Sequence, residues 1–354
     1  MTKRTVCVLF GGVSPEHEVS LRSAECILNN IDREKNQVFA VGITRKGEWI
    51  LFPGTDYSLL PKDQWAQAPG CCRCAISPSR GDGLVIFSEN GPKFERLDVV
   101  FPVLHGENGE DGSVQGLMQV AGIPCVGPGV AASSACMDKT MTKLVVDRTE
   151  VRQARWHLVT KEDFSDDAND VMDAVESLFR YPVFVKPAGT GSSVGVSKAR
   201  SHAELRDALR EALKYDRKVL VEEFIHGHEI EVAVLGNHDP IASVPGEIIA
   251  GAEFYDYEAK YISDTSSTVI PAELSPEVAE QVRADAVTVY RALGCRGLSR
   301  VDFFVTFEDE MVVFNEINTL PGFTSISMYP KLFDASGVGC TQLIERLLEL
   351  AEQE

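Results

Sequence analysis

The 354-residue sequence has no long apolar run and no excess of basic residues, and its cysteines are odd in number. No run of about 18 apolar residues occurs, which argues against a membrane-spanning helix. The short apolar run Val6–Phe10 leads directly into Gly11 and then into charged residues, so it does not have the pattern of a secretory signal. The length and composition favour a globular protein of two or three domains.

Positive charge is scarce, because 34 Lys and Arg stand against 53 Asp and Glu and give a formal net charge of −19. Nucleic acids and anionic membrane surfaces are bound by clustered Lys and Arg, so the sequence argues against both as partners. A local positive pocket for a small phosphate compound is still compatible with this acidic chain.

The nine cysteines are an odd number in a long chain, which fits reduced thiols in the cytoplasm better than a disulfide framework. Cys71, Cys72 and Cys74 lie close together, but no second Cys or His pair stands at a ligand-like spacing. We therefore expect a surface loop there rather than a zinc site.

The sequence divides into three zones, at residues 1–130, 131–220 and 221–354. In the first zone β-rich runs alternate with helical patterns, which predicts a parallel sheet covered by helices, with an insertion at about residues 49–96. The strands expected there are Thr5–Phe10, Val38–Thr44 and Val99–Leu104, with a helix at Ser20–Asn30. Beyond it we expect strands at Val183–Lys186, Val194–Lys198 and Val219–Phe224, and helices at His202–Tyr215 and Cys340–Glu352.

A glycine-rich segment follows the apolar strand that ends at Lys186. It contains Gly189, Gly191 and Gly195, with Ser192 and Ser193 between them. Glycines let backbone N–H groups converge and hydroxyl groups add donors, so the segment favours an anion-binding loop. It is neither a Walker loop nor a dinucleotide fingerprint, and an ordinary turn is the alternative.

Lys186 itself is expected to be buried, where an ammonium group needs a compensating anion. A nucleotide phosphate would supply that anion. The alternative is a lysine that snorkels from the end of its strand.

Two strand-like runs, Leu298–Thr306 and Met311–Asn318, flank an acidic turn and predict an antiparallel hairpin. Centring the turn on Asp309 places Asp302 opposite Glu316. The residues expected on one face are Arg300, Asp302, Phe304, Phe314, Glu316 and Asn318, with Arg300 opposite Asn318.

Two carboxylates and an amide oxygen on this face would be stabilised by a cation, and they suit a Mg²⁺ that keeps water and phosphate oxygens as its other ligands. The alternative is a salt bridge between Arg300 and Glu316 on an exposed face, against which the apolar neighbours argue. The anion loop and the metal hairpin together predict phosphoryl transfer from a nucleotide.

These residues resemble the ATP-grasp superfamily and, within it, the D-alanine–D-alanine ligase family. The matching segments, in chain order, are Leu9–Ser20, Leu104–Gly112, Met137–Lys139, Lys186–Gly195, Phe254–Tyr261, Arg300–Asp302 and Asn315–Ser325. The resemblance implies an α/β fold of three domains, α+β in the ATP-grasp part. The nucleotide would be held between the central and C-terminal domains.

The resemblance also implies a reaction. ATP would phosphorylate the carboxylate of a first D-alanine, and the amine of a second would attack the acyl phosphate to give D-alanyl-D-alanine for peptidoglycan precursor synthesis. The implied enzyme is a cytoplasmic homodimer that uses Mg²⁺ or Mn²⁺, with two ions.

By the same resemblance, Glu16 pairs with the ammonium group of the first D-alanine, His105 lies beside that substrate, and Ser192 and Tyr261 hydrogen-bond with the glutamate. Arg300 and the backbone of Gly322 stabilise the tetrahedral oxyanion, while Ser327 and Met328 border the second substrate. The residues expected to contact ATP are Lys139, Lys186, Ser193, Glu222, Glu223, Ile225, Glu229 and Lys260, and the metal ligands are Asp302, Glu316 and Asn318. Taken alone, Glu16 also reads as an acid in the first turn of a helix, and Met328 as a core residue.

Relatives that join D-alanine to D-lactate or D-serine often replace the lid tyrosine and carry Arg at the position of Met328. Tyr261 and Met328 therefore favour D-alanine as the second substrate. The alternative from another class is a non-catalytic amino-acid or nucleotide sensor, which need not keep three metal-ligand residues.

Overall fold

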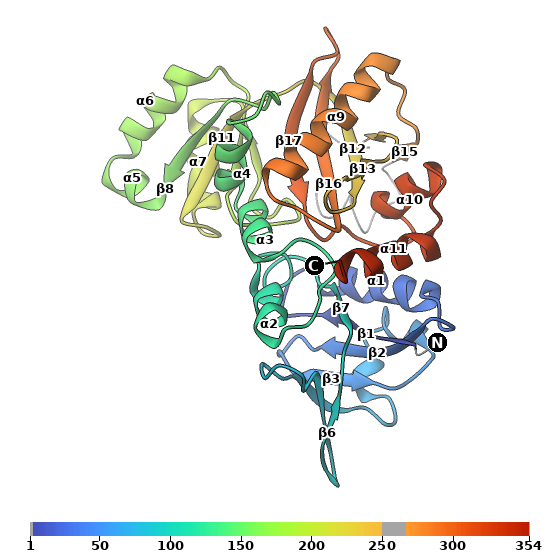
Figure 1. Ribbon diagram of the computed structural model, residues 1–354. Helices are drawn as coiled ribbons and strands as arrows, with labels where there is room; N and C mark the ends of the chain where they lie inside the picture. Colours follow the sequence, from blue (N-terminus) through green and yellow to red (C-terminus); the bar gives the residue numbers. More distant parts are fainter. Residues whose placement is uncertain (1–2, 250–266, 354) are drawn as a thin grey trace.

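The computed structural model describes residues 3–249 and 267–353 of the chain. The chain forms three lobes, with the N-terminal lobe at the bottom of Figure 1 and the other two above it. Each lobe is built around one sheet, and the sheets have seven, four and six strands.

The first lobe contains the strands and helices expected near the N-terminus. Its elements are β1 (Arg4–Gly11), α1 (His17–Asn30), β2 (Asn36–Ile43), β3 (Trp49–Phe52), β4 (Cys72–Ile76), β5 (Leu84–Ser88), β6 (Gly91–Glu95), β7 (Val99–Val103) and α2 (Ser113–Ala121), with short 3₁₀ turns at Tyr57–Leu59 and Trp65–Gln67. The three predicted strands are confirmed as β1, β2 and β7, and the predicted helix is α1, which begins three residues earlier, at His17.

The first sheet is mixed rather than wholly parallel. β1 is parallel to β2 and β7, whereas β3 to β6 continue the sheet in antiparallel pairs from β2. The expectation of a surface loop around the three cysteines was wrong, since Cys72 begins β4 and Cys74 is buried. The reason is the alternation of this strand, which turns Cys74 and Ile76 into an apolar cluster with β1 and β2.

The second lobe is an antiparallel sheet in the order β10-β9-β11-β8. This part of the chain contains α3 (Val130–Met137), α4 (Lys139–Val146), β8 (Trp156–Thr160), α5 (Lys161–Asp166), α6 (Ala168–Leu178), β9 (Val183–Pro187), β10 (Ser197–Ala199), α7 (His202–Ala212) and β11 (Lys218–Glu223). The strand predicted from Val194 begins only at Ser197, because turn hydrogen bonds from Val194 to Gly191 and from Val196 to Ser193 precede it.

The third lobe is an antiparallel sheet in the order β15-β14-β12-β16-β17, with β13 paired to β12. Its elements are β12 (Gly227–Leu235), β13 (Ile241–Ala242), β14 (Gly246–Ile249), β15 (Ser267–Val269), α9 (Pro276–Ala292), β16 (Leu298–Thr306), β17 (Val312–Asn318), α10 (Met328–Ala335) and α11 (Cys340–Ala351). β11, the strand predicted at the start of the third zone, is instead hydrogen-bonded to β8 and β9 in the second lobe.

The predicted hairpin of β16 and β17 is confirmed, and so are its two polar pairs, Asp302 with Glu316 and Arg300 with Asn318. A shift in register after Asp302 then pairs Phe303, rather than Phe304, with Phe314. The placement of Phe304 with Phe314 was therefore wrong, because an irregularity of one residue reverses the alternation of the strand beyond it.

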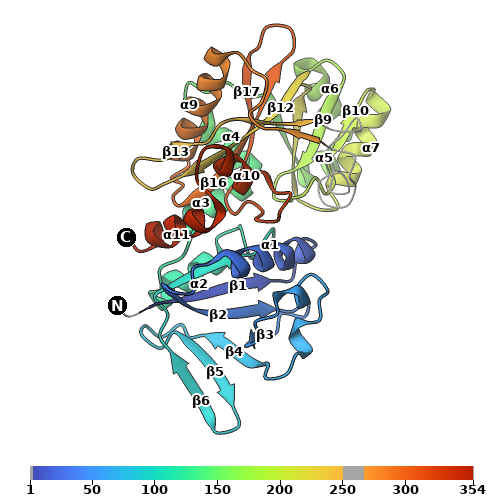
Figure 2. The ribbon, with the colours of Figure 1, turned by 90° about the vertical axis from the view of Figure 1, so that its right-hand side faces the viewer.

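The first and third lobes share one apolar core. α11 lies against α1 in Figures 1 and 2, and buried side chains of β1, α1, α10 and α11 form a single cluster. In α11, Leu343 and Leu347 are fully buried and Leu350 is packed at the edge of the cluster, as their spacing predicts. This core fixes the loops after β1 and β7 relative to the β16–β17 hairpin.

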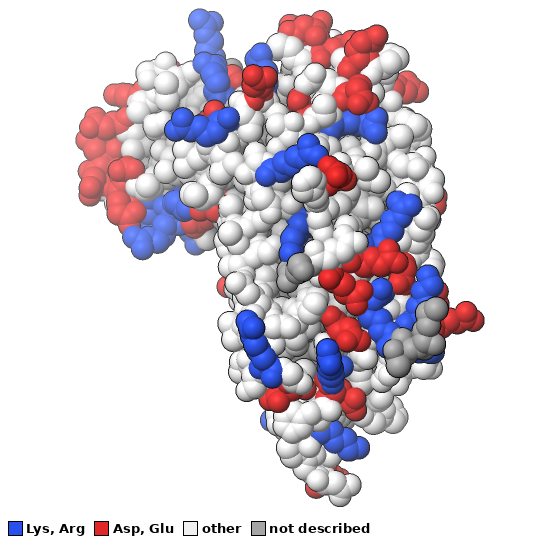
Figure 3. All heavy atoms as spheres, viewed as in Figure 1, with Lys and Arg blue, Asp and Glu red and all other residues white. Residues whose placement is uncertain are grey.

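Within residues 3–249 and 267–353, no helix has both the length and the apolar content needed to cross a membrane. On the face shown in Figure 3, acidic side chains gather over the lobe that carries α5 and α6. This acidic surface agrees with the net charge of the sequence.

We expect Leu347→Ala to lower the free energy of unfolding by about 2–5 kcal/mol, because the residue is fully buried in the core shared by two lobes. Chemical denaturation monitored by circular dichroism measures the change. The matched control is Leu178→Ala at the end of α6, where the side chain is 47% exposed and the expected change is about 0.5 kcal/mol or less. Equal effects of the two substitutions would contradict the shared core.

Candidate active site

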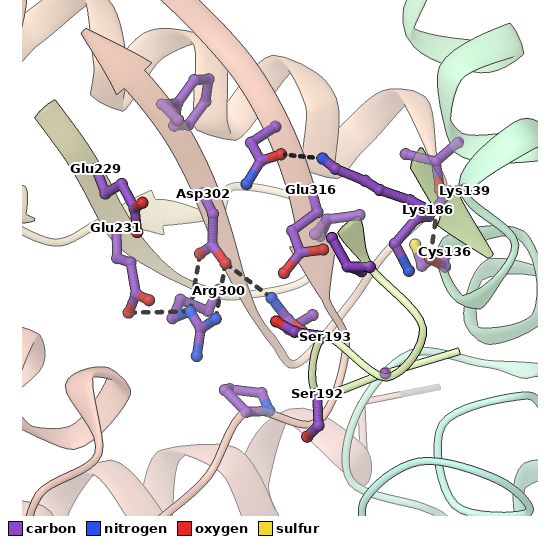
Figure 4. A pocket seen from close by; sticks show the side chains of 18 of the residues that line it. Cys136, Lys139, Lys186, Ser192, Ser193, Glu229, Glu231, Arg300, Asp302 and Glu316 are labelled. Atoms are coloured by element: carbon purple, nitrogen blue, oxygen red, sulfur yellow. Dashed lines mark hydrogen bonds and ion pairs between the residues drawn. The ribbon is translucent and has the colours of Figure 1, made fainter. Parts of the chain in front are cut away.

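One pocket lies where the three lobes meet, and every predicted site residue within the described ranges lines it (Figure 4). These residues are Glu16, His105, Lys139, Lys186, Ser192, Ser193, Glu222, Glu223, Ile225, Glu229, Arg300, Asp302, Glu316, Asn318, Gly322, Ser327 and Met328. The other two predicted residues, Lys260 and Tyr261, lie outside the described residues.

Glu16 stands between β1 and α1 and reaches the glycine-rich segment of the second lobe. The side-chain hydroxyl of Ser192 donates a hydrogen bond to the Glu16 carboxylate, as predicted. Gly106 leaves room for that carboxylate, because a Cβ atom there would lie 2.5 Å from Oε2 of Glu16. The carboxylate is buried, and it lies at the contact between the first and second lobes.

The glycine-rich segment forms a series of turns rather than a strand. Ser192 and Ser193 have φ angles of 48° and 59°, which lie in the left-handed region that non-glycine residues rarely adopt. Strained backbone of this kind is common where a loop clamps a ligand. Lys139, at the start of α4, donates a hydrogen bond of 2.7 Å to the carbonyl oxygen of Thr190 and so holds the loop from the other side.

The anion beside Lys186 is a carboxylate of the protein. The two oxygens of Glu222 pair with Lys143 at 2.9 Å and with Lys186 at 2.6 Å, and all three side chains lie largely out of solvent. Burial raises the pKa of Glu222, but the two ammonium groups outweigh burial and lower that pKa to about 2. Glu222 therefore holds both ammonium groups in place at the pocket, where their N–H groups can also face a phosphate.

Lys186 therefore does not snorkel. Neither its pairing with Glu222 nor the presence of Lys143 was predicted from the sequence. Burial opposes the charge of Lys186, yet the attraction of Glu222 raises the pKa of this lysine. Lys186 also donates a hydrogen bond of 3.1 Å to the side-chain oxygen of Asn315. The one available signal for Lys143 was its spacing, since it lies one helical turn after Lys139.

A row of carboxylates crosses three neighbouring strands. Glu231 on β12 is paired with Asp302 on β16, which is paired in turn with Glu316 on β17. Arg300 lies on the same face, donates to both oxygens of Asp302 at 2.8 and 2.7 Å, and forms an ion pair with Glu231 at 3.0 Å (Figure 4). Asp302 is only 7% exposed, so the alternative of a salt bridge on an exposed face was wrong.

The hairpin offers suitable donors for Mg²⁺. Asp302, Glu316 and Asn318 carry side-chain oxygen atoms at neighbouring positions of the two paired strands. The side-chain amide nitrogen of Asn318 donates a hydrogen bond of 3.0 Å to the Asp302 carboxylate. Among the described residues, no three His, Cys, Asp or Glu side chains form a metal-binding group by themselves. Two carboxylates and one amide oxygen would suit an ion that completes its coordination with water and phosphate oxygens.

The segment between β17 and α10 also lines the pocket. Gly322 lies close to Ser327, and a Cβ atom on Gly322 would stand 2.7 Å from the Ser327 hydroxyl oxygen. Met328 is the first residue of α10. It is buried in the core and also lines the pocket, so the prediction and its alternative both apply to it.

One predicted ATP contact, Glu223, has a partner within the protein, and a second, Ile225, follows an aromatic residue. Glu223 lines the pocket, but its carboxylate accepts hydrogen bonds from the backbone and the side chain of Arg155. Its backbone is therefore the part left to face a ligand. Ile225 lies in the loop between β11 and β12, near the ring pair of Phe184 and Phe224, whose centroids are 5.9 Å apart.

We expect Glu222→Gln to lower the free energy of unfolding by about 3–5 kcal/mol, since it leaves two buried ammonium groups without their anion. Because the folded-state pKa of Glu222 lies below its usual 4.5, the stabilisation is present above about pH 4.5 and is lost as the pH falls toward 2. The matched control is Glu223→Gln, whose partner Arg155 is exposed, with an expected cost of about 1 kcal/mol or less. Denaturation curves of both variants at neutral pH test the pair, and equal costs would contradict it.

Comparison with known proteins agrees with this architecture over the whole chain. A family model described as the D-ala D-ala ligase N-terminus matches residues 5–128, and one described as the D-ala D-ala ligase C-terminus matches residues 145–349. A D-alanine–D-alanine ligase of Acetivibrio thermocellus is 50% identical, covering 99% of this chain and 96% of the relative. The ligase of that name from Clostridium acetobutylicum is 46% identical, covering 99% and 98%.

Solved structures give the same result. The VanG D-Ala:D-Ser ligase from Enterococcus faecalis superposes with a TM-score of 0.90 at 37% identity, covering 99% of this chain and all of that one. The D-alanine–D-alanine ligase from Coxiella burnetii gives a TM-score of 0.85 at 34% identity, covering 99% and 94%. With two family models and full-length relatives in agreement, the chain belongs to the D-alanine–D-alanine ligase family, whose members have the ATP-grasp fold.

Proposed function

We propose that this chain is an ATP-dependent ligase that joins two D-alanine molecules into D-alanyl-D-alanine for peptidoglycan precursor synthesis. The observation that carries the proposal is the composition of the single pocket at the junction of the three lobes. It combines a buried acid for an ammonium group, lysines for phosphates and an oxygen-rich hairpin for a cation.

The first D-alanine would bind between the first and third lobes. Glu16 would pair with its ammonium group, and the hydrogen bond from Ser192 holds the carboxylate in place for that contact. His105 would lie beside this substrate. Burial lowers the pKa of His105, so a neutral ring would face the amino acid.

ATP would lie between the second and third lobes. Lys139, Lys186 and the loop at Ser193 would hold its phosphates, with Glu222 keeping Lys186 charged and in place. Ile225 and Glu229, with the backbone of Glu222 and Glu223, would hold the adenine and ribose. Lys260 and Tyr261 belong to this proposal through the family resemblance alone.

Asp302, Glu316 and Asn318 would hold Mg²⁺ or Mn²⁺. The bound metal would neutralise charge on the transferring phosphate. We propose two ions, because Glu316 lies opposite Asp302 and on the same strand face as Asn318, so one carboxylate can serve two cations.

The reaction would proceed in two steps. A carboxylate oxygen of the first D-alanine attacks the γ-phosphorus of ATP and ADP leaves, which converts a poor leaving oxygen into phosphate. The amine of the second D-alanine then attacks the carbonyl carbon, and phosphate departs from the tetrahedral intermediate. Arg300 and the backbone N–H of Gly322 would stabilise the oxyanion, and the enclosed pocket would exclude water from the acyl phosphate.

Ser327 and Met328 would border the second substrate. Met328 presents an apolar side chain there, and it is buried beside Gly246, where a Cβ atom would lie 2.6 Å from its terminal methyl carbon. An apolar wall favours the methyl group of D-alanine over the hydroxymethyl group of D-serine. The similarity to a D-Ala:D-Ser ligase keeps D-serine as the second candidate for this position.

A cytoplasmic homodimer is part of the proposal. All nine cysteines are free thiols, which suits a reducing compartment.

Purified protein is expected to release phosphate and form D-alanyl-D-alanine only when ATP, Mg²⁺ and D-alanine are present together. Glu316→Ala removes a metal ligand and should lower turnover by about a thousandfold or more while the fold is retained. The control is Glu308→Ala in the exposed turn of the same hairpin, which should keep wild-type turnover. A coupled ADP assay and mass spectrometry of the product provide both readings. Full activity of the Glu316 variant would mean that the metal site is misplaced.

A mixed-substrate assay tests the second-substrate pocket. With D-alanine plus either D-serine or D-lactate, we expect D-alanyl-D-alanine as the main product. The preference over D-serine should be about 10- to 100-fold, since an apolar pocket rejects an added hydroxyl only modestly. Product masses from equimolar mixtures decide the question. A dominant D-alanyl-D-serine product would instead assign the chain to the second candidate function.

A further inference from the structure

Three side chains of the first lobe hold the segment Leu320–Phe323, which leads from β17 to the oxyanion position at Gly322. They are Ser23 on α1 and His105 and Glu110 in the loop between β7 and α2. Neither Ser23 nor Glu110 is among the predicted site residues, although Glu110 lies within the motif Leu104–Gly112.

Glu110 joins its own loop to this segment. One carboxylate oxygen accepts a hydrogen bond of 2.8 Å from the backbone of Gly106, and the other accepts one of 3.2 Å from the backbone of Leu320. Burial, and then the nearby Glu16, raise the pKa of Glu110 to about 8. The two backbone donors and Arg300 lower this pKa, but their effect is smaller. Because burial outweighs these donors, the Glu110 side chain is largely a neutral carboxyl group at pH 7, and its two oxygens accept the two backbone hydrogen bonds in that form.

His105 and Ser23 hold the other sides of the segment. The His105 ring nitrogen Nδ1 lies 3.0 Å from the carbonyl oxygen of Leu320, and Nε2 lies 3.2 Å from the hydroxyl oxygen of Ser23. The backbone N–H of Phe323 donates to that same hydroxyl oxygen at 3.1 Å. A neutral ring that donates from Nδ1 and accepts from Ser23 satisfies all three contacts.

The backbone donors of the segment are thus almost all used. Leu320 donates to Glu110, Pro321 has no N–H group and Phe323 donates to Ser23. The N–H of Gly322 has no acceptor among the described residues, and Gly322 lines the pocket. The segment therefore leaves one backbone donor for a ligand.

We propose that Glu110 and Ser23 are positioning residues that hold the Gly322 N–H group where the oxyanion of the tetrahedral intermediate forms. This inference rests on the proposed function. It means that side chains of the first lobe position a backbone N–H group of the third lobe. Glu16 lies beside Gly106, the other residue that Glu110 holds, so the same clamp connects the ammonium site with the oxyanion site.

Glu110→Gln tests the clamp with little change in shape. The amide nitrogen of Gln cannot accept an N–H bond, so one of the two backbone contacts is lost. We expect kcat for D-alanyl-D-alanine formation to fall about 10- to 100-fold, since small displacements of an oriented donor cost this much. The KM for ATP should stay within about twofold, because no phosphate contact is changed.

The matched control is Glu107→Gln, the same chemical change on an exposed residue of the same loop. It should leave kcat and the KM for ATP at wild-type values. Equal kcat for the two variants would overturn the proposal. So would a parallel loss of kcat and ATP affinity in Glu110→Gln, which would indicate a general structural role.

Ser23→Ala provides a second test that does not depend on the folding of the Glu110 variant. It removes the acceptor of the Phe323 N–H group, and it should also lower kcat about tenfold with an unchanged KM for ATP. Wild-type kcat in this variant would contradict the clamp. Failure of the proposed function is distinguishable, because wild-type protein would then form no dipeptide at all.

Discussion

The hydrogen-bond register of β12, β16 and β17 is the constraint on which the rest of the site depends. It places Glu231, Asp302 and Glu316 in one row and Arg300 beside them. A slip of one residue would move every one of these side chains to the opposite face of the sheet. The second lobe adds lysine side chains to the pocket, and the first lobe holds the segment Leu320–Phe323, which follows β17. The active site is therefore a property of the junction rather than of any single lobe.

Charge is arranged on two scales. The chain as a whole is strongly acidic, with a net charge of −19, yet the nucleotide side of the pocket has two buried ammonium groups, on Lys143 and Lys186, around the single carboxylate of Glu222. Burial makes the attraction between these groups strong, because charges removed from water are poorly screened. In the proposed function, the acidic exterior repels polyanionic macromolecules, whereas the buried lysines bind the phosphates of one small nucleotide. The same carboxylate keeps the two lysines from repelling each other before a nucleotide binds.

Much of the fold and of the site could be predicted from the sequence because the decisive signals are local. Alternation and one turn were enough to place Asp302 opposite Glu316, and the ordered motifs identified residues that the structure brings together in one pocket. What failed depends on contacts between distant segments or on irregularity. The register shift after Asp302 has no clear sequence signal, and it turns Phe314 away from Phe304 into the core beside Phe303. The partnership of Glu222 with Lys186 joins two different strands, and the role of Glu110 depends on a segment more than two hundred residues away.

The central claim is that the pocket activates a carboxylate by phosphorylation before the peptide bond forms. The most direct measurement follows oxygen rather than turnover. D-alanine labelled with ¹⁸O in its carboxylate is incubated with ATP, Mg²⁺ and the protein, and the released phosphate is analysed by mass spectrometry. The account predicts one ¹⁸O atom transferred to phosphate for each dipeptide formed, because the carboxylate oxygen that attacks phosphorus leaves with it. Dipeptide formation with unlabelled phosphate would contradict the account.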